Sequence, residues 1–136
     1  MTVKKTFFDT SIFIYALESG SAIAKNLFEQ SITDGVVGTS TITLMEYAIG
    51  CFKHDRQDII ENFQRFLRVI KCEVVPINGV IAIKAAEIRS RYEAFKQMDA
   101  LQIATAVVSG ANVFYTNDKQ LLKFRGIAVI NPFNEA

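Results

Sequence analysis

The sequence has one histidine, two cysteines and no glycine-rich phosphate-binding motif, and these shortages exclude several classes of site. Cys51, Cys72 and His54 do not follow a familiar zinc-binding spacing, and the two cysteines form no CxxC pair. We therefore expect two free, buried thiols in a reducing cytosol. A single histidine also leaves no convincing Ser-His-Asp or Cys-His arrangement, and neither a P-loop nor a dinucleotide-binding motif occurs.

Long apolar runs and an excess of charge are also missing. Two lysines precede apolar residues near the N-terminus, but Asp9 interrupts this stretch, and residues 12–17 are too few for a signal-peptide core or a membrane span. We expect a cytoplasmic protein with no membrane partner. The 15 Lys and Arg against 14 Asp and Glu give a net charge of +1, so any surface that binds nucleic acid must be local.

What the sequence does contain is an alternation of short β-prone runs with longer helical patterns. With 136 residues, 50% of them hydrophobic, and a mean hydropathy of +0.21, the chain predicts one compact domain over 1–136. The predicted strands are 6–8, 36–39, 73–77, 113–116 and 127–130. This alternation predicts an α/β fold, with a central parallel sheet of about five strands covered by helices on both faces. Residues 41–71 depart from it, because they predict two successive helices.

The helical segments show which of their faces are apolar. Two predicted helix faces consist of Ile59, Phe63, Phe66 and Ile70, and of Ile81, Ala85, Ile88 and Tyr92. Residues 101–109 are almost continuously apolar, which predicts a helix that is buried on most sides. Gly110 supplies its C-terminal stop.

Four carboxylates lie where the neighbouring apolar pattern argues against a simple solvated charge. Asp9 and Asp118 each follow a predicted strand, and ligands of an open parallel sheet bind beyond the carboxyl ends of its strands. Taken alone, either residue also suits a helix N-cap, because Asp is among the best capping residues. The other two acids, Glu46 and Asp99, lie within predicted helices.

These two helical acids are expected to point inward. The packed face of the first helix is predicted to consist of Ile42, Met45 and Ile49. The Glu46 carboxylate should then lean over that face. Asp99 repeats the arrangement above Ile103 and Val107. Charges rarely point inward without a partner, so two inward acids and two acids at strand ends favour a shared metal over coincidence.

A cluster of carboxylates predicts a particular metal and chemistry. Hard oxygen ligands select Mg²⁺ or Mn²⁺, and Mg²⁺ is usually shared between a few carboxylates and a phosphate. The pattern therefore points to metal-assisted phosphodiester hydrolysis. Polar residues beside the strand-end acids suit either turn formation or hydrogen bonds that orient the carboxylates, and these residues are Thr10, Ser11, Thr116 and Asn117. Strand alternation points Thr116 back toward Asp9.

Several motifs occur in a fixed order along the chain. They are Phe8-Asp9-Thr10-Ser11, Glu46 in a helix after the second strand, Asp99-Ala100-Leu101-Gln102-Ile103-Ala104-Thr105-Ala106, and Thr116-Asn117-Asp118. In this order the chain resembles the PIN-domain ribonucleases, and more narrowly the VapC toxins of prokaryotic type II toxin–antitoxin pairs. The resemblance covers essentially the whole chain, whose length suits a stand-alone toxin. It departs from the family at Gln97-Met98, where many relatives carry proline or another small residue, so the start of that helix stays open.

The resemblance implies a five-stranded parallel sheet between helices and a metal-dependent endoribonuclease. It implies that the catalytic, metal-binding acids are Asp9, Glu46, Asp99 and Asp118. Thr116 corresponds to the hydroxyl position that supports the first acid, and Ser11 to a polar position beside it. The resemblance also implies an RNA substrate, which in relatives is tRNA or rRNA, together with a cognate antitoxin and a homodimer.

The sequence offers candidate surfaces for these partners. Eleven phenylalanines in a short chain leave more apolar surface than a small monomer hides, and we expect 41–71 to carry a homodimer face or an antitoxin groove. With a net charge near zero, RNA must be held by local cations near the acids. The candidates are Lys96, Lys119, Arg89 and Arg91, each of which alone also suits a solvated helix face.

Two alternatives belong to other functional classes. A phosphatase of the haloacid-dehalogenase type needs a second Asp two residues after Asp9, where this chain has Ser11. A PIN-like module that binds nucleic acid, or acts as a scaffold without catalysis, would be marked by the loss of one or more acids, whereas all four are present. Metal-dependent RNA cleavage that one Asp-to-Asn change abolishes would separate the enzyme from the binding module.

Overall fold

The computed structural model describes residues 3–133, so the first two and last three residues of the predicted domain lie outside the described residues. A five-stranded sheet forms its centre, with strands β1 (Lys4–Phe8), β2 (Gly35–Ser40), β3 (Glu73–Val75), β4 (Val113–Tyr115) and β5 (Ala128–Ile130). The strand order is β3-β2-β1-β4-β5, and every neighbouring pair is parallel. All five predicted strands are present, and the predicted parallel α/β fold is confirmed.

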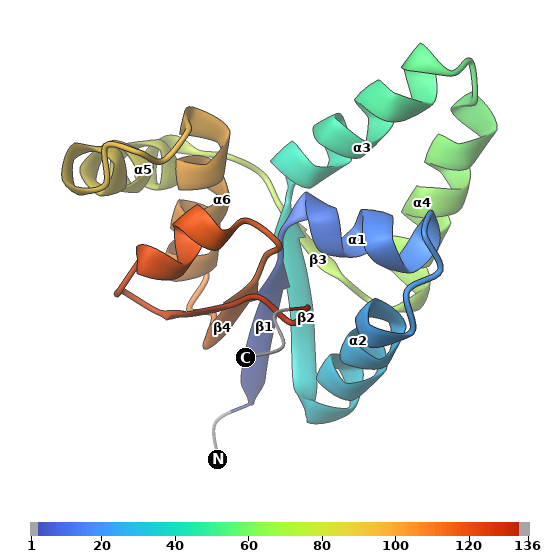
Figure 1. Ribbon diagram of the computed structural model, residues 1–136, viewed down its shortest axis with the longest axis horizontal. Helices are drawn as coiled ribbons and strands as arrows, with labels where there is room; N and C mark the ends of the chain where they lie inside the picture. Colours follow the sequence, from blue (N-terminus) through green and yellow to red (C-terminus); the bar gives the residue numbers. More distant parts are fainter. Residues whose placement is uncertain (1–2, 134–136) are drawn as a thin grey trace.

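Helices cover both faces of the sheet. One face carries α1 (Thr10–Leu17), α2 (Ala22–Asp34), α3 (Thr41–Lys53) and α4 (Gln57–Val69), and the other carries α5 (Gly79–Arg91) and α6 (Gln97–Val108), as Figure 1 shows. A short 3-10 helix, η1 (Lys119–Lys123), follows β4. The two successive helices predicted in 41–71 are α3 and α4. The helix whose start the sequence left open begins at Gln97.

The central strand β1 joins the two halves of the core because its side chains alternate between the faces of the sheet. Phe7 packs into the cluster under α5 and α6, and Phe8 into the cluster under α1 to α4. The Phe8 ring lies 4.4 Å from the ring of Phe28 and 6.0 Å from that of Phe13, measured between ring centroids. Both predicted apolar helix faces pack into these two clusters, and most of α6 between Ala100 and Ala106 is buried.

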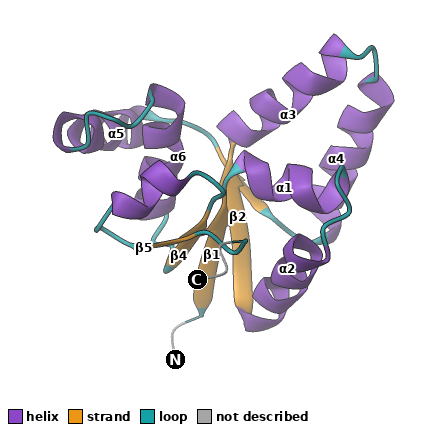
Figure 2. Ribbon diagram, viewed as in Figure 1, coloured by secondary structure: helices purple, strands orange, loops and turns teal. Residues whose placement is uncertain are grey.

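The order of the strands places the candidate site. The chain builds β2 and β3 on one side of β1, then crosses the sheet and adds β4 and β5 on the other side. Figure 2 shows β2 and the β4–β5 pair on opposite sides of β1. Ligands of open parallel sheets bind at such a reversal, beyond the carboxyl ends of the strands. Here β1 and β4 are neighbours, and the Asp9 N–H donates to the Tyr115 carbonyl oxygen at 2.9 Å. The segment after β1 and the segment after β4 therefore lie side by side.

The predicted packed face of α3 is wrong. Met45 is 43% exposed and Ile49 is 44% exposed, so only Ile42 of the predicted stripe is buried. The inward face carries Thr43 and Tyr47 instead. Thr43 is held by hydrogen bonds to other buried hydroxyl groups, and the Tyr47 ring stacks on Phe63 with centroids 4.0 Å apart. Hydrogen bonds and aromatic stacking thus bury polar and mixed side chains here, and the aliphatic stripe faces outward.

The expectations drawn from rare residues are confirmed in part. Cys51 and Cys72 are both free, but only Cys51 is buried, whereas Cys72 is partly exposed. His54 lies in the turn between α3 and α4. None of the helices in the described part of the chain combines the length and apolar character that crossing a membrane requires.

Candidate active site

Asp9 is the most deeply placed acid of the site. It follows β1 directly and caps α1, because its Oδ1 accepts a hydrogen bond from the Thr10 N–H at 2.8 Å. Its Oδ2 accepts from the Thr116 hydroxyl at 2.7 Å, as the strand alternation predicts. The N-cap interpretation of Asp9 is therefore confirmed, and the same carboxylate lies at the end of the sheet where β1 and β4 stop, as the ligand-binding interpretation requires.

Glu46 comes to the site from α3, one helical turn after the buried Thr43. The Thr10 hydroxyl donates to Glu46 Oε1 at 2.6 Å, which ties this carboxylate to the residue that follows Asp9. Glu46 is half-buried, as a residue at the edge of the inward face should be. Its inward position thus follows from its spacing to Thr43 and not from the aliphatic stripe that the sequence predicted.

Asp99 and Asp118 complete the set from the other half of the molecule. Asp99 lies in the first turn of α6 and is half-buried. Asp118 caps η1 by accepting from the Gln120 N–H at 2.9 Å, and its own N–H donates to the Thr116 hydroxyl at 3.0 Å. Thr116 therefore contacts both strand-end acids, and the structure brings all four predicted acids to one region.

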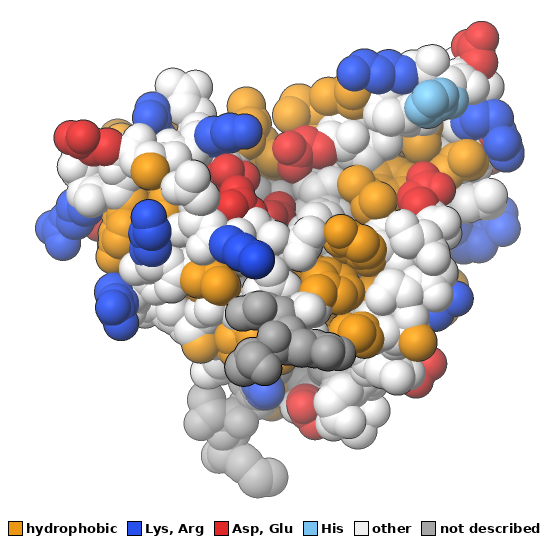
Figure 3. All heavy atoms as spheres, viewed as in Figure 1, with side chains coloured by type: hydrophobic (Ala, Val, Ile, Leu, Met, Phe, Trp, Pro, Cys, Tyr) orange, Lys and Arg blue, Asp and Glu red, His pale blue; other side chains and the backbone are white. Residues whose placement is uncertain are grey.

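Two of the acids, Asp9 and Asp99, bind a proton more readily than a free carboxylate does. Burial is the main reason that the pKa of Asp9 rises from 3.8 to about 6; hydrogen bonds from Thr116 and Thr10 oppose this rise, and the nearby Asp99 and Glu46 charges add to it. The pKa of Asp99 is also raised, first by burial and then by Asp118 and Glu46, while Lys96 lowers it. Figure 3 shows acidic side chains gathered in a hollow between the two helical halves, with Lys or Arg side chains on its rim.

The donor set suits Mg²⁺ or Mn²⁺ more than it suits Zn²⁺, which Cys and His bind more often. All four groups are carboxylates, which are the hard oxygen ligands that Mg²⁺ and Mn²⁺ prefer. Within residues 3–133, no three His, Cys, Asp or Glu side chains converge on a common point in the way metal ligands do. Glu46 and Asp118 are turned to hydrogen-bond donors, which accounts for this spread. Like charges in one hollow also favour separated side chains.

The predicted polar neighbours divide into two groups. Thr10 and Thr116 touch the carboxylates directly, as described above. In the described part of the chain, no side-chain hydrogen bond joins Ser11 or Asn117 to the acids; the Asn117 N–H donates to Ser11 Oγ at 3.2 Å, and its amide nitrogen donates to the Tyr15 hydroxyl at 3.1 Å. These two contacts hold the loop after β4 against α1, so Ser11 and Asn117 support the site through the backbone.

The four predicted RNA-binding cations also differ in their surroundings. Lys96 and Lys119 are exposed, and each lies within three residues of an acid of the site. Arg89 donates from Nε to the Phe95 carbonyl oxygen at 2.9 Å, and Arg91 lies 3.9 Å from Glu87. The two arginines are thus engaged by their own half of the molecule, which leaves the two lysines as the better placed pair.

One buried residue of the site was not singled out by the sequence pattern. The Gln102 side chain is 2% exposed, and its amide nitrogen donates to Thr43 Oγ1 at 2.8 Å, to Thr10 Oγ1 at 3.3 Å and to Asp9 Oδ1 at 3.4 Å. Its amide oxygen accepts from the Ser40 hydroxyl. A polar residue within an otherwise apolar helix, one turn after Asp99, was the available signal.

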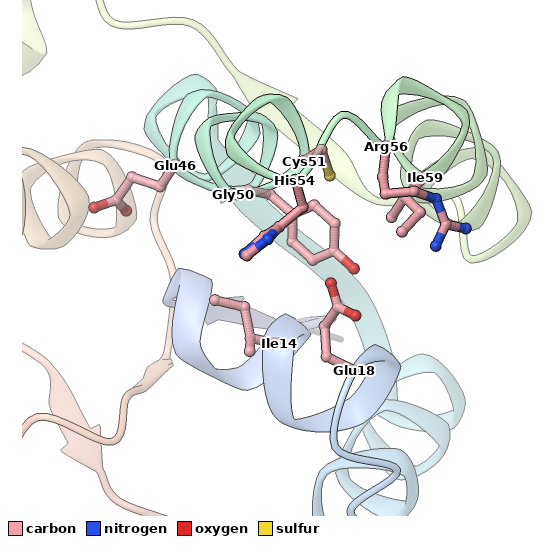
Figure 4. A pocket seen from close by; sticks show the side chains of 9 residues that line it. Ile14, Glu18, Glu46, Gly50, Cys51, His54, Arg56 and Ile59 are labelled. Carbon is pink, nitrogen blue, oxygen red and sulfur yellow. The ribbon is translucent and has the colours of Figure 1, made fainter.

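A pocket of about 390 Å³ adjoins the acids between α1 and the α3–α4 pair. Its lining includes Ile14 and Glu18 from α1 and its end, and Glu46, His54 and Arg56 from the α3–α4 side. Figure 4 shows the Glu46 carboxylate turned away from the rest of this lining, at one end of the pocket. The pocket therefore opens beside the acid cluster, and its lining combines acidic and apolar side chains.

Comparison with known proteins agrees with this geometry. The PIN domain family matches residues 6–127, and no curated protein matches the chain. A toxin–antitoxin complex from Klebsiella pneumoniae contains a similar chain, with 26% identity, a TM-score of 0.73, and coverage of 96% of this chain and 99% of that one. VapBC2 from Rickettsia felis, bound to a DNA fragment from its promoter, has a TM-score of 0.81 at 19% identity, with coverage of 93% and 98%.

A third structure, FitAcB from Neisseria gonorrhoeae, has a TM-score of 0.77 at 19% identity and covers 96% of this chain and 99% of that one. The likeness at 19% identity concerns the fold, whereas the family match extends over most of the chain, from within β1 to the residue before β5. The resemblance read from the sequence motifs is thereby confirmed. The chain belongs to the PIN domain family.

Proposed function

We propose that this chain is a metal-dependent endoribonuclease that acts as the toxin of a toxin–antitoxin pair. The observation that carries the proposal is the meeting of four carboxylates from β1, α3, α6 and the loop after β4 at the reversal point of the sheet. Membership of the PIN domain family supports a nuclease, and the similar Klebsiella chain belongs to a toxin–antitoxin complex.

The proposed cofactor is Mg²⁺ or Mn²⁺, with Asp9, Asp99, Asp118 and Glu46 as the residues that would hold it. When bound, such an ion lowers the pKa of water and stabilises charge on a leaving phosphate oxygen. The protein's own contribution is to orient the carboxylates. Thr116 holds Asp9 and the backbone of Asp118, and Thr10 holds Glu46. A carboxylate that does not contact the ion is available to accept a proton from water.

The proposed substrate is RNA, with tRNA or rRNA as the expected class. Lys96 and Lys119 would contact phosphates, because both are exposed and each lies within three residues of an acid. Lys96 is close enough that its charge opposes the rise in the pKa of Asp99. Arg89 and Arg91 would contribute only if their present partners were exchanged for phosphate. Such a substrate places the reaction in the cytoplasm, as the sequence predicts.

The proposed protein partners use two different faces of α3. The pocket beside Glu46 combines Glu18 with the apolar Ile14, and it suits an antitoxin segment that carries a basic residue next to an apolar one. The outward stripe of α3, with Met45, Ile49 and Phe52 exposed by 43% to 59%, is the proposed homodimer face.

The homodimer face can be tested separately from catalysis. Ile49→Lys should convert a dimer into a monomer in sedimentation velocity at tens of micromolar, because it buries a charge in the interface. Ile83→Lys on α5 is the matched control, since Ile83 is 73% exposed on the opposite half of the molecule. A wild-type monomer would contradict the proposed dimer, and a dimer that only Ile83→Lys disrupts would place the interface on α5.

The decisive experiment compares RNA cleavage by wild type and by Asp99→Asn in Mg²⁺ and in EDTA. Asp99→Asn should keep the fold and lose activity, because it removes one charge from the cation site with little change of shape. Glu61→Gln is the matched control, because Glu61 lies on the exposed side of α4 and its change also removes one negative charge. Full cleavage by Asp99→Asn, or cleavage by wild type in EDTA, would contradict the proposal. RNA binding without any cleavage by wild type would favour the non-catalytic binding module.

A further inference from the structure

The buried amide of Gln102 occupies a position that the chemistry proposed above does not use. It lies on α6 three residues after Asp99, so the two side chains are one helical turn apart, with Asp99 near the surface and Gln102 beneath it. Burying an amide is unfavourable unless its donors and acceptor are satisfied. In residues 3–133 no buried side-chain nitrogen or oxygen lacks a partner, and the partners of Gln102 belong to the site itself.

Its hydrogen bonds determine which way the amide faces. Ser40 Oγ already accepts from the Ile42 N–H at 3.0 Å, so the Ser40 hydroxyl hydrogen is free to donate to the Gln102 amide oxygen. That bond directs the amide nitrogen to the other side, toward hydroxyl and carboxylate oxygens that accept. Thr43 takes one N–H at 2.8 Å, and the second lies between Thr10 at 3.3 Å and Asp9 at 3.4 Å. A reversed amide would place its oxygen against the Asp9 carboxylate.

The same amide reaches two of the four acids. It contacts Asp9 Oδ1 directly, and it contacts the oxygen of Thr10, whose hydroxyl hydrogen is donated to Glu46 at 2.6 Å. A carboxylate has about four acceptor positions. Asp9 uses two on Oδ1, for Thr10 N–H and Gln102, and one on Oδ2, for Thr116. One position therefore remains, and it is on Oδ2.

We propose that Gln102 is a positioning residue that orients Asp9 directly and Glu46 through Thr10, so that both carboxylates are prepared for a divalent cation. This inference rests on the proposed function, because it assumes that these acids bind the cation. As a neutral donor, Gln102 stabilises the ionised carboxylate without adding a positive charge that would compete with the cation. A buried lysine or arginine in the same place would also stabilise the ionised carboxylate, but its positive charge would compete with the divalent cation.

The test is the affinity for Mn²⁺ alone, measured by calorimetric titration without RNA. Gln102→Met keeps the length of the side chain and removes its donors, and we expect Mn²⁺ affinity to fall about tenfold, the size of effect typical when a group that orients a metal ligand is removed. RNA cleavage should recover as Mn²⁺ is raised, while urea denaturation in EDTA should show that Gln102→Met is still folded without the cation, which separates weaker binding from a general loss of stability. Thr105→Val is the matched control: it removes a fully buried hydroxyl from the same helix, and that hydroxyl donates only to Leu101 of α6.

The outcomes separate this inference from the proposed function. If wild type binds no Mn²⁺, the proposed metal chemistry is wrong. If wild type binds Mn²⁺ and Gln102→Met binds it equally well, the proposed chemistry stands and the positioning role is wrong. Should Gln102→Met fail to fold, Ser40→Ala frees the amide oxygen and lets the amide rotate. That variant should weaken Mn²⁺ binding by about threefold or more, and unchanged binding would refute the role as well.

Discussion

Replacing Asp9 by asparagine is expected to stabilise this protein in metal-free buffer at neutral pH. Burial raises the pKa of Asp9 from 3.8 to about 6, so the folded state binds a proton there more readily than the unfolded chain does. The cost of ionising the buried carboxyl is absent below about pH 4 and grows as the pH rises through this interval. Above about pH 6 the cost is fully present.

The size of the effect follows from the pKa. One pKa unit corresponds to about 1.4 kcal/mol, so the change from 3.8 to about 6 lowers the free energy of unfolding by about 3 kcal/mol at pH 7.5. The substituted asparagine would avoid this cost, but its amide group donates where the carboxylate accepts from Thr116, and one imperfect hydrogen bond costs about 1 kcal/mol. A net gain of about 2 kcal/mol is expected at pH 7.5, and a small loss is expected at pH 4.

Urea denaturation in EDTA at pH 4, 6 and 7.5 measures this difference. Asp34→Asn is the matched control, because Asp34 is an exposed acid at the end of α2. Added Mn²⁺ should reverse the order of stability, since binding at 100 times the dissociation constant stabilises the wild type by about 2.7 kcal/mol and Asp9→Asn by less. A stability difference between wild type and Asp9→Asn that stays constant from pH 4 to 7.5 would refute the reasoning.

Three further predictions concern other parts of the molecule. Glu46→Gln should weaken Mg²⁺ affinity and RNA cleavage together while changing the free energy of unfolding by less than about 1 kcal/mol, since a glutamine oxygen can still accept from Thr10; equal activity across a Mg²⁺ titration would contradict it. The double change Lys96→Ala and Lys119→Ala should weaken RNA binding and reduce the slope of log affinity against log salt by up to about 1.5, whereas Lys25→Ala with Lys53→Ala should leave both unchanged. Gly38→Ala should destabilise the fold by about 1–3 kcal/mol in a denaturation experiment, because its Cβ would lie 2.3 Å from the buried Phe7 ring, whereas Gly79→Ala, with no atom within 4 Å, should not.

Local sequence patterns were sufficient to predict the strands and the positions of two of the acids, Asp9 and Asp118. Short β-prone runs separated by helices identify β1 and β4, and the rule for parallel sheets then places Asp9 beside the segment from Thr116 to Asp118 without any knowledge of contacts. The ends of the short strands moved by one or two residues, because hydrogen bonds to neighbouring strands decide where a strand stops. The roles assigned to the acids and to the cations stay predictions.

The parts that failed depend on long-range partners. In α3, hydropathy favoured Met45 and Ile49, but the inward face was decided by hydroxyl groups and by Phe63 on the next helix. The partners of Gln102 could not be predicted for the same reason, because Thr43 and Asp9 lie 59 and 93 residues away in the chain. Periodicity reports how apolar a face is, and it cannot report which distant groups meet that face.

The hydrogen bond between Asp9 and Thr116 spans 107 residues, and this separation has a consequence for the synthesis of the protein. The first acid leaves the ribosome early, but β4 must emerge and pair with β1 before Thr116 can hold it. Pairing between distant parallel strands is slow to form, because the intervening chain must first be ordered. If the proposed nuclease activity is correct, a partly made chain lacks the assembled site. The ribosome and its tRNAs would then be exposed to the enzyme only after nearly the whole domain has folded.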